Sequence, residues 1–464
     1  MSINSRIWVI STCLCFGNVL LQAGDWPRYL LNDQHHSHAL DETAINKQTV
    51  ASLQPIWETD LGALVAAAPI VVKGVVYVGA WDGTFFAVDA LTGDVKWKTF
   101  VGLATQTNAP NCMQSIGVSA SAVIHGDEVL VPGGDANLYA LDRVTGRELW
   151  RVQMADPALG NYLWAPPVMH NDLAYVGLSS LGDCPMVRGG IARLDLGASR
   201  MPEPPLVTYV MPEDEVGGGV WTAPAIDPDT GSIFTVTGNS EDPSDAEVGR
   251  YGGGMLKLTP DAGSVEAAFF IPTNVPGADL DWGSSPTLFP ASDGTPLIAA
   301  TGKDGVLYVR RRDDLSEVYQ VQVAQGCICP ECGCGSLSTP SYDGVRLYVG
   351  GGVVPNEDDI YTGSIYALNP DNGEIFWLRR LEGTLIAPTT IAGGVLFVPT
   401  TTGLEALDCD TGKTLWIAPT RGILYSQVAV ANGVIYVTWL NGTVSAYAPA
   451  PPGTPSAVRR APSL

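Results

Sequence analysis

Short aliphatic strands separated by turn residues recur along the whole chain. Eight of them read VVYVG, EVLVPG, LAYVG, SIFTVTG, PLIAATG, RLYVG, VLFVP and VIYVT. Each follows another aliphatic strand, which in most cases opens on a small residue and a proline, as at Ala68-Pro69 and Ala387-Pro388. Proline is tolerated at the first residue of a strand because its missing N–H costs least there. The pattern therefore predicts an all-β chain built from antiparallel strand pairs.

A tryptophan marks a further strand in four places. The segments read AVDALTGDVKW (87–97), ALDRVTGRELW (140–150), ALNPDNGEIFW (367–377) and ALDCDTGKTLW (406–416). In each segment a glycine after Thr or Asn supplies a tight turn, and the tryptophan follows that glycine by four residues. The tryptophans are therefore predicted to pack between neighbouring repeat units rather than to serve a site.

The two patterns together define eight units of roughly four strands, at the spacing of about 40–50 residues typical of propeller blades. The third to fifth units lack the tryptophan motif, and the last unit, which ends near Ala450, also lacks it. The early segment PIWETDLG, with Trp57, can supply the missing strand and close the ring, which removes exposed sheet edges. We predict an eight-bladed β-propeller of four-stranded blades over 24–450 and a disordered Pro- and Ala-rich tail over 451–464.

Charge and the N-terminal pattern limit where the protein acts. The net charge of −23 repels phosphate, so we expect no nucleic-acid partner. Arg6 precedes an apolar run over 7–21, and Ala23 suits cleavage, so residues 1–23 resemble a signal peptide; an uncleaved membrane anchor is the alternative. No later stretch is long and apolar enough to span a bilayer. We therefore expect a periplasmic or secreted protein without a membrane span once the signal is removed.

A few polar and aromatic residues break the repeat at equivalent positions. Asn239 and Lys303 end the second strands of neighbouring units, in TVTGN and AATGK. Trp221 stands shortly before the strand that opens at Pro224, and Asp281 shortly before the strand that opens at Pro286. Equivalent positions of successive blades form a ring around the propeller axis, so we expect these side chains to gather at one mouth of the channel. Unlike polar groups in such a mouth are typical of a ligand site.

The repeat and these four residues resemble the pyrroloquinoline quinone (PQQ) propeller family, the quinoprotein alcohol dehydrogenases. The resemblance implies that Trp221 stacks on the flat quinone, that Asn239 binds a calcium ion, and that Lys303 lies beside the quinone oxygens. It implies that Asp281 is the catalytic base. Chemistry agrees, because an aromatic face holds a flat cofactor and Ca²⁺ takes amide and carboxylate oxygens. The function implied is oxidation of an alcohol with PQQ and Ca²⁺ as cofactors.

The chain departs from that family's pattern in two respects. A metal-binding Glu is usual in the third blade, but here LGDCPMVRGG offers Asp183 beside Cys184, so Asp183 is our second candidate metal ligand. Adjacent cysteines over the quinone are usual too, and this chain has only Cys112, which we place beside the cofactor. These features resemble the polyvinyl-alcohol dehydrogenase branch, and a Cys112–Cys184 disulfide is one option that the resemblance implies.

The sequence bears on the electron acceptor and on the alcohol. No haem motif C-x-x-C-H is present, so electrons would pass to an external acceptor such as a cytochrome c. The alcohol oxidised is small or polymeric, and the sequence does not choose between them.

The departures from the family pattern also leave a second function open. The alternative function is a non-catalytic propeller that acts as a cell-envelope scaffold or binding protein. Such a scaffold would not need four functional residues in one mouth.

The remaining cysteines and histidines yield three expectations. The run CICPECGCG favours disulfides over a zinc site, since one compact loop can hardly close a tetrahedral shell; its cysteines are Cys327, Cys329, Cys332 and Cys334. Cys409 is expected to be unpaired. The HHSH segment, with His35, His36 and His38, is expected to be a solvated loop rather than a metal site.

Overall fold

The structure is a computed structural model. It describes residues 24–105, 115–197, 202–240, 250–272, 279, 281–326, 334–355, 361–419 and 421–451. In these ranges the helices are two short 3₁₀ turns, η1 (Val50–Ser52) and η2 (Pro157–Leu159), and none is long and apolar enough to cross a membrane. The rest is strand and turn, as the alternation of apolar runs and turn residues predicts.

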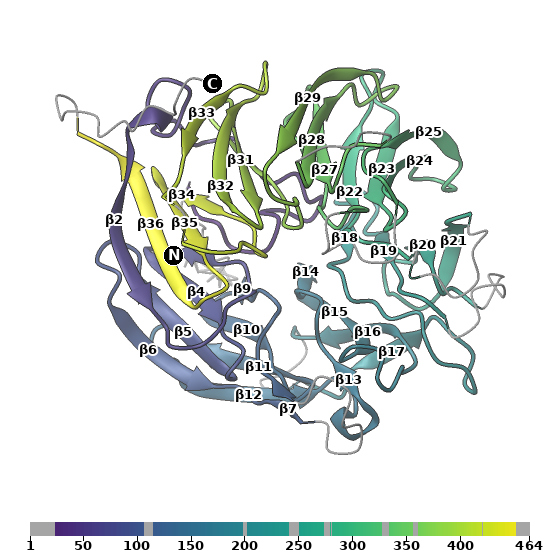
Figure 1. The fold of residues 1–464 in the computed structure, drawn as a ribbon. Helices are drawn as coiled ribbons and strands as arrows, with labels where there is room; N and C mark the ends of the chain where they lie inside the picture. The colour runs from purple at the N-terminus through teal and green to yellow at the C-terminus, as the bar shows by residue number, and fades with distance from the viewer. Residues whose placement is uncertain are drawn as a thin grey trace, which may run out of the picture.

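Eight sheets stand around a common axis, each built on four antiparallel strands of which the first is innermost (Figure 1), and two of them carry a short fifth strand. The first four sheets, in strand order, are β3 (Ile70–Val72), β4 (Val75–Gly79), β5 (Thr84–Asp89) and β6 (Val95–Phe100); β9 (Val123–His125), β10 (Glu128–Pro132), β11 (Asn137–Asp142) and β12 (Glu148–Gln153); β14 (Val168–His170), β15 (Leu173–Ser180), β16 (Gly190–Asp195) and β17 (Leu206–Tyr209); and β18 (Ala225–Ile226), β19 (Ile233–Val236), β20 (Gly254–Leu258) and β21 (Val265–Phe270).

The other four sheets complete the ring and confirm the predicted eight-bladed propeller. They are β22 (Thr287–Pro290), β23 (Pro296–Thr301), β24 (Val306–Arg311) and β25 (Glu317–Gln322); β26 (Ser341–Tyr342), β27 (Leu347–Gly351), β28 (Gly363–Leu368) and β29 (Ile375–Leu381); β30 (Thr390–Ala392), β31 (Val395–Thr400), β32 (Gly403–Asp408) and β33 (Thr414–Ile417); and β34 (Ala429–Ala431), β35 (Val434–Thr438), β36 (Thr443–Pro449) and β2 (Leu53–Asp60).

The ring is closed by an N-terminal strand, as the sequence predicts. β2 pairs antiparallel with β36 and is the outermost strand of the eighth sheet. Trp57 lies opposite Ala446 in this pairing, in the place that the other tryptophan strands occupy in their own sheets. A strand from the beginning of the chain therefore pairs with the edge of β36 and completes the last sheet.

Several outer tryptophans dock on the turn of the following sheet, which explains the glycine in the repeat; Trp150 instead donates to Glu128 of its own sheet. The Trp97 indole N–H donates to the carbonyl of Arg143, 3.3 Å away, and a Cβ on Gly146 would lie only 2.4 Å from the Trp97 ring. Trp377 binds the Cys409 carbonyl in the same way at 2.9 Å. In the fifth sheet, which lacks the motif, Tyr319 takes this place and donates to the Pro370 carbonyl.

The segment that precedes β2 runs along the channel-facing side of the inner strands and contacts every sheet. Its backbone or side chains bond to one residue each of the eight sheets, through Trp26–Val71, Pro27–Ile124, Arg28–Met169, Asp33–Ile226, Gln34–Leu288, His36–Tyr342, Ser37–Ile391 and Glu42–Gly433. One short piece, β1 (His38–Ala39), pairs with β30 in parallel. Trp26, Leu30 and Ser37 are fully buried.

The solvated loop predicted for His35 is wrong. His35 is only 1% exposed, and its Nδ1 lies 2.7 Å from the Pro286 carbonyl. His36 Nε2 contacts the Leu288 carbonyl at the same distance. The imidazoles satisfy carbonyls of the inner strands, so they act as buried hydrogen-bond donors rather than as solvated groups. Within the described residues no group of three or more His, Cys, Asp or Glu is placed to hold a metal.

Candidate functional site

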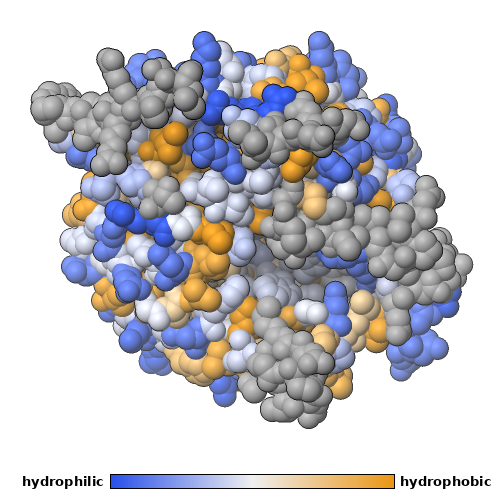
Figure 2. Space-filling view, in the orientation of Figure 1, coloured by the Kyte–Doolittle hydropathy of each residue, from blue (hydrophilic) through white to orange (hydrophobic). Residues whose placement is uncertain are grey.

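The predicted site residues lie at one end of the ring, where the second strand of each sheet ends and the first begins. Asn239 follows β19, and Lys303 follows β23. Trp221 precedes β18, and Asp281 precedes β22. Viewed as in Figure 2, the molecular surface is hollowed at the centre of the ring.

Three of these residues form a connected polar cluster. Asp281 Oδ2 accepts the backbone N–H of Asn239 at 3.0 Å. Lys303 Nζ lies 2.6 Å from Asp281 Oδ1, as an ion pair whose angles are not those of a good hydrogen bond. The backbone N–H of Lys303 also donates to the Asp281 carbonyl at 2.8 Å. Residues from the fourth and fifth sheets are thus joined across their boundary, as the equivalent positions in the repeat predict.

The structure adds Asp279, which the sequence reasoning missed. Its Oδ1 accepts from Asn239 Nδ2 and from Lys303 Nζ, each at 2.7 Å. The signal was present, since Asp279 and Asp281 alternate around Leu280 in ADLDWG and so point to the same side of an extended chain. The side chain of Asp279 is 44% exposed, against 5% for Asp281. The cluster therefore contains one buried and one accessible carboxylate.

Burial governs the protonation of this cluster. Desolvation raises the pKa of Asp281 to about 6, although the Lys303 ammonium acts in the opposite direction. Burial lowers the pKa of Lys303, but the charges of Asp281 and Asp279 outweigh it and raise the value above that of an ordinary lysine. A carboxyl group with a pKa near neutrality is suited to accept and release a proton.

An aromatic face and close backbone packing complete the arrangement. Lys303 Nζ lies 5.4 Å from the centre of the half-buried Trp221 ring, so the cation and the indole face adjoin one another. A Cβ on Gly238 would lie 3.1 Å from Asp281 Oδ2, so the glycine allows the carboxylate to approach the strand end. The structure therefore brings together Trp221, Asn239, Asp281 and Lys303, whose roles remain proposals.

The other two predicted site residues stand apart from this cluster or outside the described chain. Asp183 is exposed, has a φ of +55°, and accepts from Ser180 Oγ at 2.5 Å. Cys112 lies outside the described residues, as do Cys327, Cys329 and Cys332. Cys184 and Cys334 are each in a disulfide bond, and the bonded state of Cys334 agrees with the expectation of disulfides in the CICPECGCG run. Cys409 is free and buried, as predicted.

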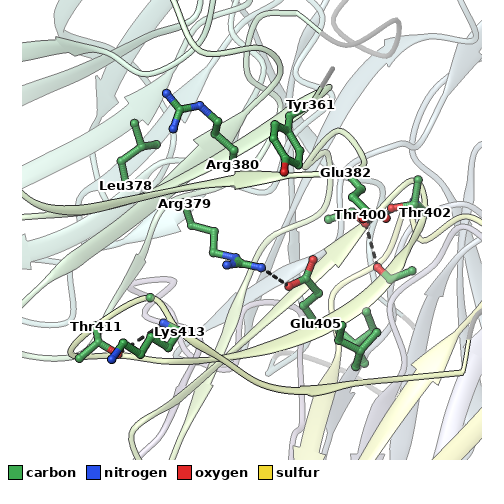
Figure 3. Close-up of a pocket in the computed structure, with 14 residues that line it drawn as sticks. Tyr361, Leu378, Arg379, Arg380, Glu382, Thr400, Thr402, Glu405, Thr411 and Lys413 are labelled. Carbon is green, nitrogen blue, oxygen red and sulfur yellow. Dashed lines mark hydrogen bonds and ion pairs between the residues drawn. The ribbon is translucent and has the colours of Figure 1, made fainter. Parts of the chain in front are cut away.

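A separate surface pocket does not coincide with the cluster. It has a volume of about 520 Å³ and lies along β29 of the sixth sheet and β32 and β33 of the seventh (Figure 3). Arg379 and Glu405 form an ion pair at 3.3 Å inside it. None of the predicted site residues lines this pocket. The polar cluster, rather than this pocket, holds the unusual chemistry.

The donor set of the cluster fits a hard cation and a flat, anionic cofactor. Asn239 uses its Nδ2 for Asp279, and within the described chain its Oδ1 accepts no hydrogen bond. Amide and carboxylate oxygens of this kind are the ligands that Ca²⁺ prefers. The Trp221 face can stack on a planar ring system, and Lys303 can pair with its carboxylates. Asn239 and Asp279 would hold the metal, whereas Trp221 and Lys303 would hold the cofactor.

Comparisons with known proteins agree with the repeat. A family profile described as outer membrane protein assembly factor BamB matches residues 46–190 and 335–451. The chain is 27% identical over 304 residues to quinohemoprotein alcohol dehydrogenase ADH IIB of Pseudomonas putida, covering 58% of this chain and 43% of the relative. It is 26% identical over 337 residues to polyvinylalcohol dehydrogenase of Pseudomonas sp., covering 65% of this chain and 51% of the relative.

Solved structures show the same fold. A quinohemoprotein alcohol dehydrogenase from Comamonas testosteroni superposes with a TM-score of 0.75 at 19% identity, over 91% of this chain and 80% of that chain. A europium-containing methanol dehydrogenase gives 0.74 at 18% identity, over 92% and 98%. The chain spans about half the length of the curated relatives, or less. It belongs to the PQQ-repeat propeller family whose profile is described as outer membrane protein assembly factor BamB, and it is similar to quinoprotein alcohol dehydrogenases.

Proposed function

We propose that the protein is an exported PQQ- and Ca²⁺-dependent dehydrogenase that oxidises an alcohol and passes the electrons to an external acceptor. The observation that carries this proposal is the cluster of Asn239, Asp279, Asp281 and Lys303 beside the Trp221 ring. Such a mixture of a buried acid, a cation, an amide and an indole has no role in packing a propeller. The curated relatives with the same repeat carry the names of quinoprotein alcohol dehydrogenases.

Each residue has a defined task in this proposal. Asp281 accepts the hydroxyl proton of the alcohol, for which its raised pKa suits it. Lys303 holds Asp281 and Asp279 in place and offers a positive charge where negative charge develops. PQQ, held by Trp221 and Lys303, would supply the hydride acceptor, and Ca²⁺, held by Asn239 and Asp279, would supply a Lewis acid. Trp221 orients the cofactor by stacking.

Reconstitution tests the proposal directly. Purified protein is mixed with PQQ and Ca²⁺, and binding is followed by the absorbance of PQQ and by quenching of tryptophan fluorescence. We expect binding close to one PQQ per chain, loss of binding when a chelator removes Ca²⁺, and alcohol-dependent reduction of an added dye. The Trp221→Ala variant should bind PQQ at least about tenfold more weakly, because stacked aromatic surface is lost. A protein that binds no PQQ at any Ca²⁺ concentration contradicts the proposal.

The second candidate is a non-catalytic scaffold of the cell envelope. The description of the matching family profile, an outer membrane assembly factor, favours it. A scaffold would show no PQQ binding and would retain its fold and stability when Asp281 or Lys303 is replaced. The same titration therefore separates the two functions.

A further inference from the structure

A small apolar cluster lies apart from the cores between the sheets. Its buried members are Ala104, Ile116, Tyr162 and Leu181, and the half-buried Trp81 and Trp164 pack against them. The residues come from loops of the first three sheets, including the short strands β7 (Ala104–Thr105), β8 (Ser115–Ile116) and β13 (Asn161–Tyr162). We call these six residues the aromatic wall.

The wall stands at the same end of the ring as the polar cluster. Trp81 follows β4, as Asn239 follows β19 and Lys303 follows β23. Tyr162 pairs with Ser179 in the sheet, and a Cβ on Gly219 would lie 3.0 Å from the Cβ of Ser179. The backbone N–H of Gly238, next to Asn239, donates to the Gly219 carbonyl. A continuous path of contacts therefore joins the wall to the polar cluster around the mouth.

The rings of the wall are held in fixed orientations. Tyr162 and Trp164 pack edge to face with their ring centres 4.7 Å apart. The Trp164 indole N–H donates to the Ser180 carbonyl at 3.0 Å, and the Tyr162 hydroxyl donates to the Gly117 carbonyl. Trp81 has no hydrogen-bond partner for its indole N–H in the described chain. Ordered aromatic side chains that stay half-exposed at a mouth offer a preformed apolar surface.

The mouth thus has two chemically different halves. The fourth and fifth sheets supply the polar cluster, whereas the first three sheets supply the aromatic wall. We propose that the aromatic wall receives the hydrocarbon part of the substrate, so that the protein acts on alcohols bearing an aromatic or extended apolar group in preference to methanol or ethanol. This inference rests on the proposed function, since the polar cluster must hold the carbinol end.

Kinetics of the PQQ- and Ca²⁺-loaded protein give the first test. The measured quantity is kcat/KM for benzyl alcohol divided by kcat/KM for ethanol. We expect a ratio of at least about 100, because a single methylene in an apolar pocket already gives roughly 10- to 200-fold discrimination. Trp164→Ala should lower the ratio about tenfold, and Trp164→Phe should restore most of it. Ile417→Ala, an exposed apolar residue on β33, is the matched control and should leave the ratio unchanged.

Binding to the cofactor-free protein gives a readout that does not depend on turnover. The probe is 2-naphthalenemethanol, and its binding is followed by energy transfer from tryptophan to the naphthyl group. We expect Trp164→Ala to weaken binding at least about fivefold and Trp81→Phe, which keeps an aromatic face, to change it little. Trp221→Ala should leave the affinity for the wall intact. Loss of binding in Trp221→Ala alone would place the probe in the cofactor slot and overturn the inference.

The two proposals fail in distinguishable ways. If the protein binds PQQ and reduces the dye normally, but kcat/KM for benzyl alcohol is about equal to that for ethanol, the proposed role of the wall is wrong. The proposed dehydrogenase function is then unaffected. If the protein does not bind PQQ but still binds the naphthyl probe in a way that depends on Trp164, the proposed dehydrogenase function is wrong. The wall would then be a binding site for an apolar ligand. If Trp164→Ala leaves the benzyl alcohol to ethanol ratio of kcat/KM unchanged, the wall has no role in substrate preference, whatever that ratio is in the wild type.

Discussion

Single residues decide the chemistry of the mouth, and the two carboxylates are the clearest case. Asp281 is enclosed, with Oδ2 bound by the Asn239 N–H and Oδ1 against the Lys303 ammonium. Asp279 is accessible and links Asn239 Nδ2 to the same ammonium. Their surroundings give them different tasks, since a buried acid near neutral pKa can transfer a proton while an exposed one positions its neighbours or binds a metal.

We predict different losses for the two acids. In the PQQ- and Ca²⁺-loaded protein, Asp281→Asn should lower kcat by about 10²–10⁴, the usual contribution of a general base, while PQQ still binds. Asp279→Asn should weaken the apparent Ca²⁺ affinity at least about tenfold, since an oxygen ligand loses its charge. Steady-state rates and Ca²⁺ titrations measure both. If Asp279→Asn abolishes turnover and Asp281→Asn does not, the accessible carboxylate is the base.

The glycine of the tryptophan repeat has a measurable packing role. Gly146 has a φ of +72° and faces the Trp97 ring, where a Cβ would lie 2.4 Å from ring carbon. Gly74 has a similar φ of +74°, but no atom lies within 4 Å of a Cβ there. We expect Gly74→Ala to cost about 1–2 kcal/mol of unfolding free energy from the backbone alone. Gly146→Ala should cost about 1–3 kcal/mol more, because the indole must shift. Equal losses in urea unfolding would show that the contact is unimportant.

The site residues could be predicted because they interrupt a repeat. Asn239 and Lys303 stand at equivalent positions, and a repeat fold turns such positions into neighbours around an axis. Asp279 was missed because its alternation with Asp281 around Leu280 indicates a shared side only for an extended chain, and a single sequence does not show that this loop is extended. The environment of Asp183 could not be predicted for the same reason, since it lies in a loop with a positive φ rather than on a strand.

At the scale of elements, the N-terminal segment over residues 26–42 bonds to the inner strands of the ring. We call this segment the clasp. It contacts all eight sheets through hydrogen bonds that are mostly between backbone groups. Such pairing leaves no periodic pattern of apolar residues, so the sequence indicated a loop. Trp-bearing outer strands were predictable because each carries its own turn and aromatic residue, and the replacement of Trp by Tyr319 in the fifth sheet concealed one copy.

The clasp makes the fold sensitive to acid. Burial lowers the pKa of His35 to about 3 from 6.5, with smaller contributions from the charges of Arg28 and His36, and burial also lowers the pKa of His36. The unfolded chain therefore binds protons that the folded chain does not, and stability falls as the pH drops from about 6.5 toward 3, by up to about 1.4 kcal/mol per pH unit for His35. Above pH 6.5 this loss is absent.

His35→Gln tests this sensitivity, because an amide can still donate to the Pro286 carbonyl but cannot gain a charge. We expect the variant to lose less unfolding free energy than the wild type between pH 6.5 and 4.5. Urea unfolding at several pH values measures the slopes. The control is the half-buried His125, whose pKa is raised by Glu128 and by Asp172: His125→Gln should not flatten the slope in this range. Parallel slopes for wild type and His35→Gln would contradict the prediction.

Ring closure by β2 gives a second prediction at this scale. Trp57 is 9% exposed, donates to the Ala90 carbonyl at 3.0 Å, and packs on Tyr436. A variant beginning at Leu61 lacks both the clasp and β2 and leaves the edge of β36 unpaired, so we expect aggregation and a much lower melting temperature. A variant beginning at Asp25 keeps the clasp and β2 and should melt like the full chain. Sedimentation and calorimetry compare them, and a stable monomer from Leu61 onward would show that closure is dispensable.

For the whole molecule, the clasp follows the inner strands around the axis, and the candidate site lies where the second strands end. Trp26, Leu30 and Ser37 of the clasp are buried. A sequence can predict that a ring closes, but which strands its first residues contact depends on bonds between residues hundreds of positions apart.

The net charge of −23 makes the electron transfer sensitive to salt, if the acceptor is a basic protein. Opposite charges raise the rate of encounter, and added ions screen the attraction beyond about 10 Å at 0.1 M. With the PQQ-loaded protein, we expect the second-order rate of reduction of a basic cytochrome c to fall at least about tenfold between roughly 20 and 300 mM salt. Reduction of a small uncharged dye by the same preparation should change less than about twofold, because no net charge steers it. Equal salt dependence for both acceptors would show that the acidic surface has no part in recognising the acceptor.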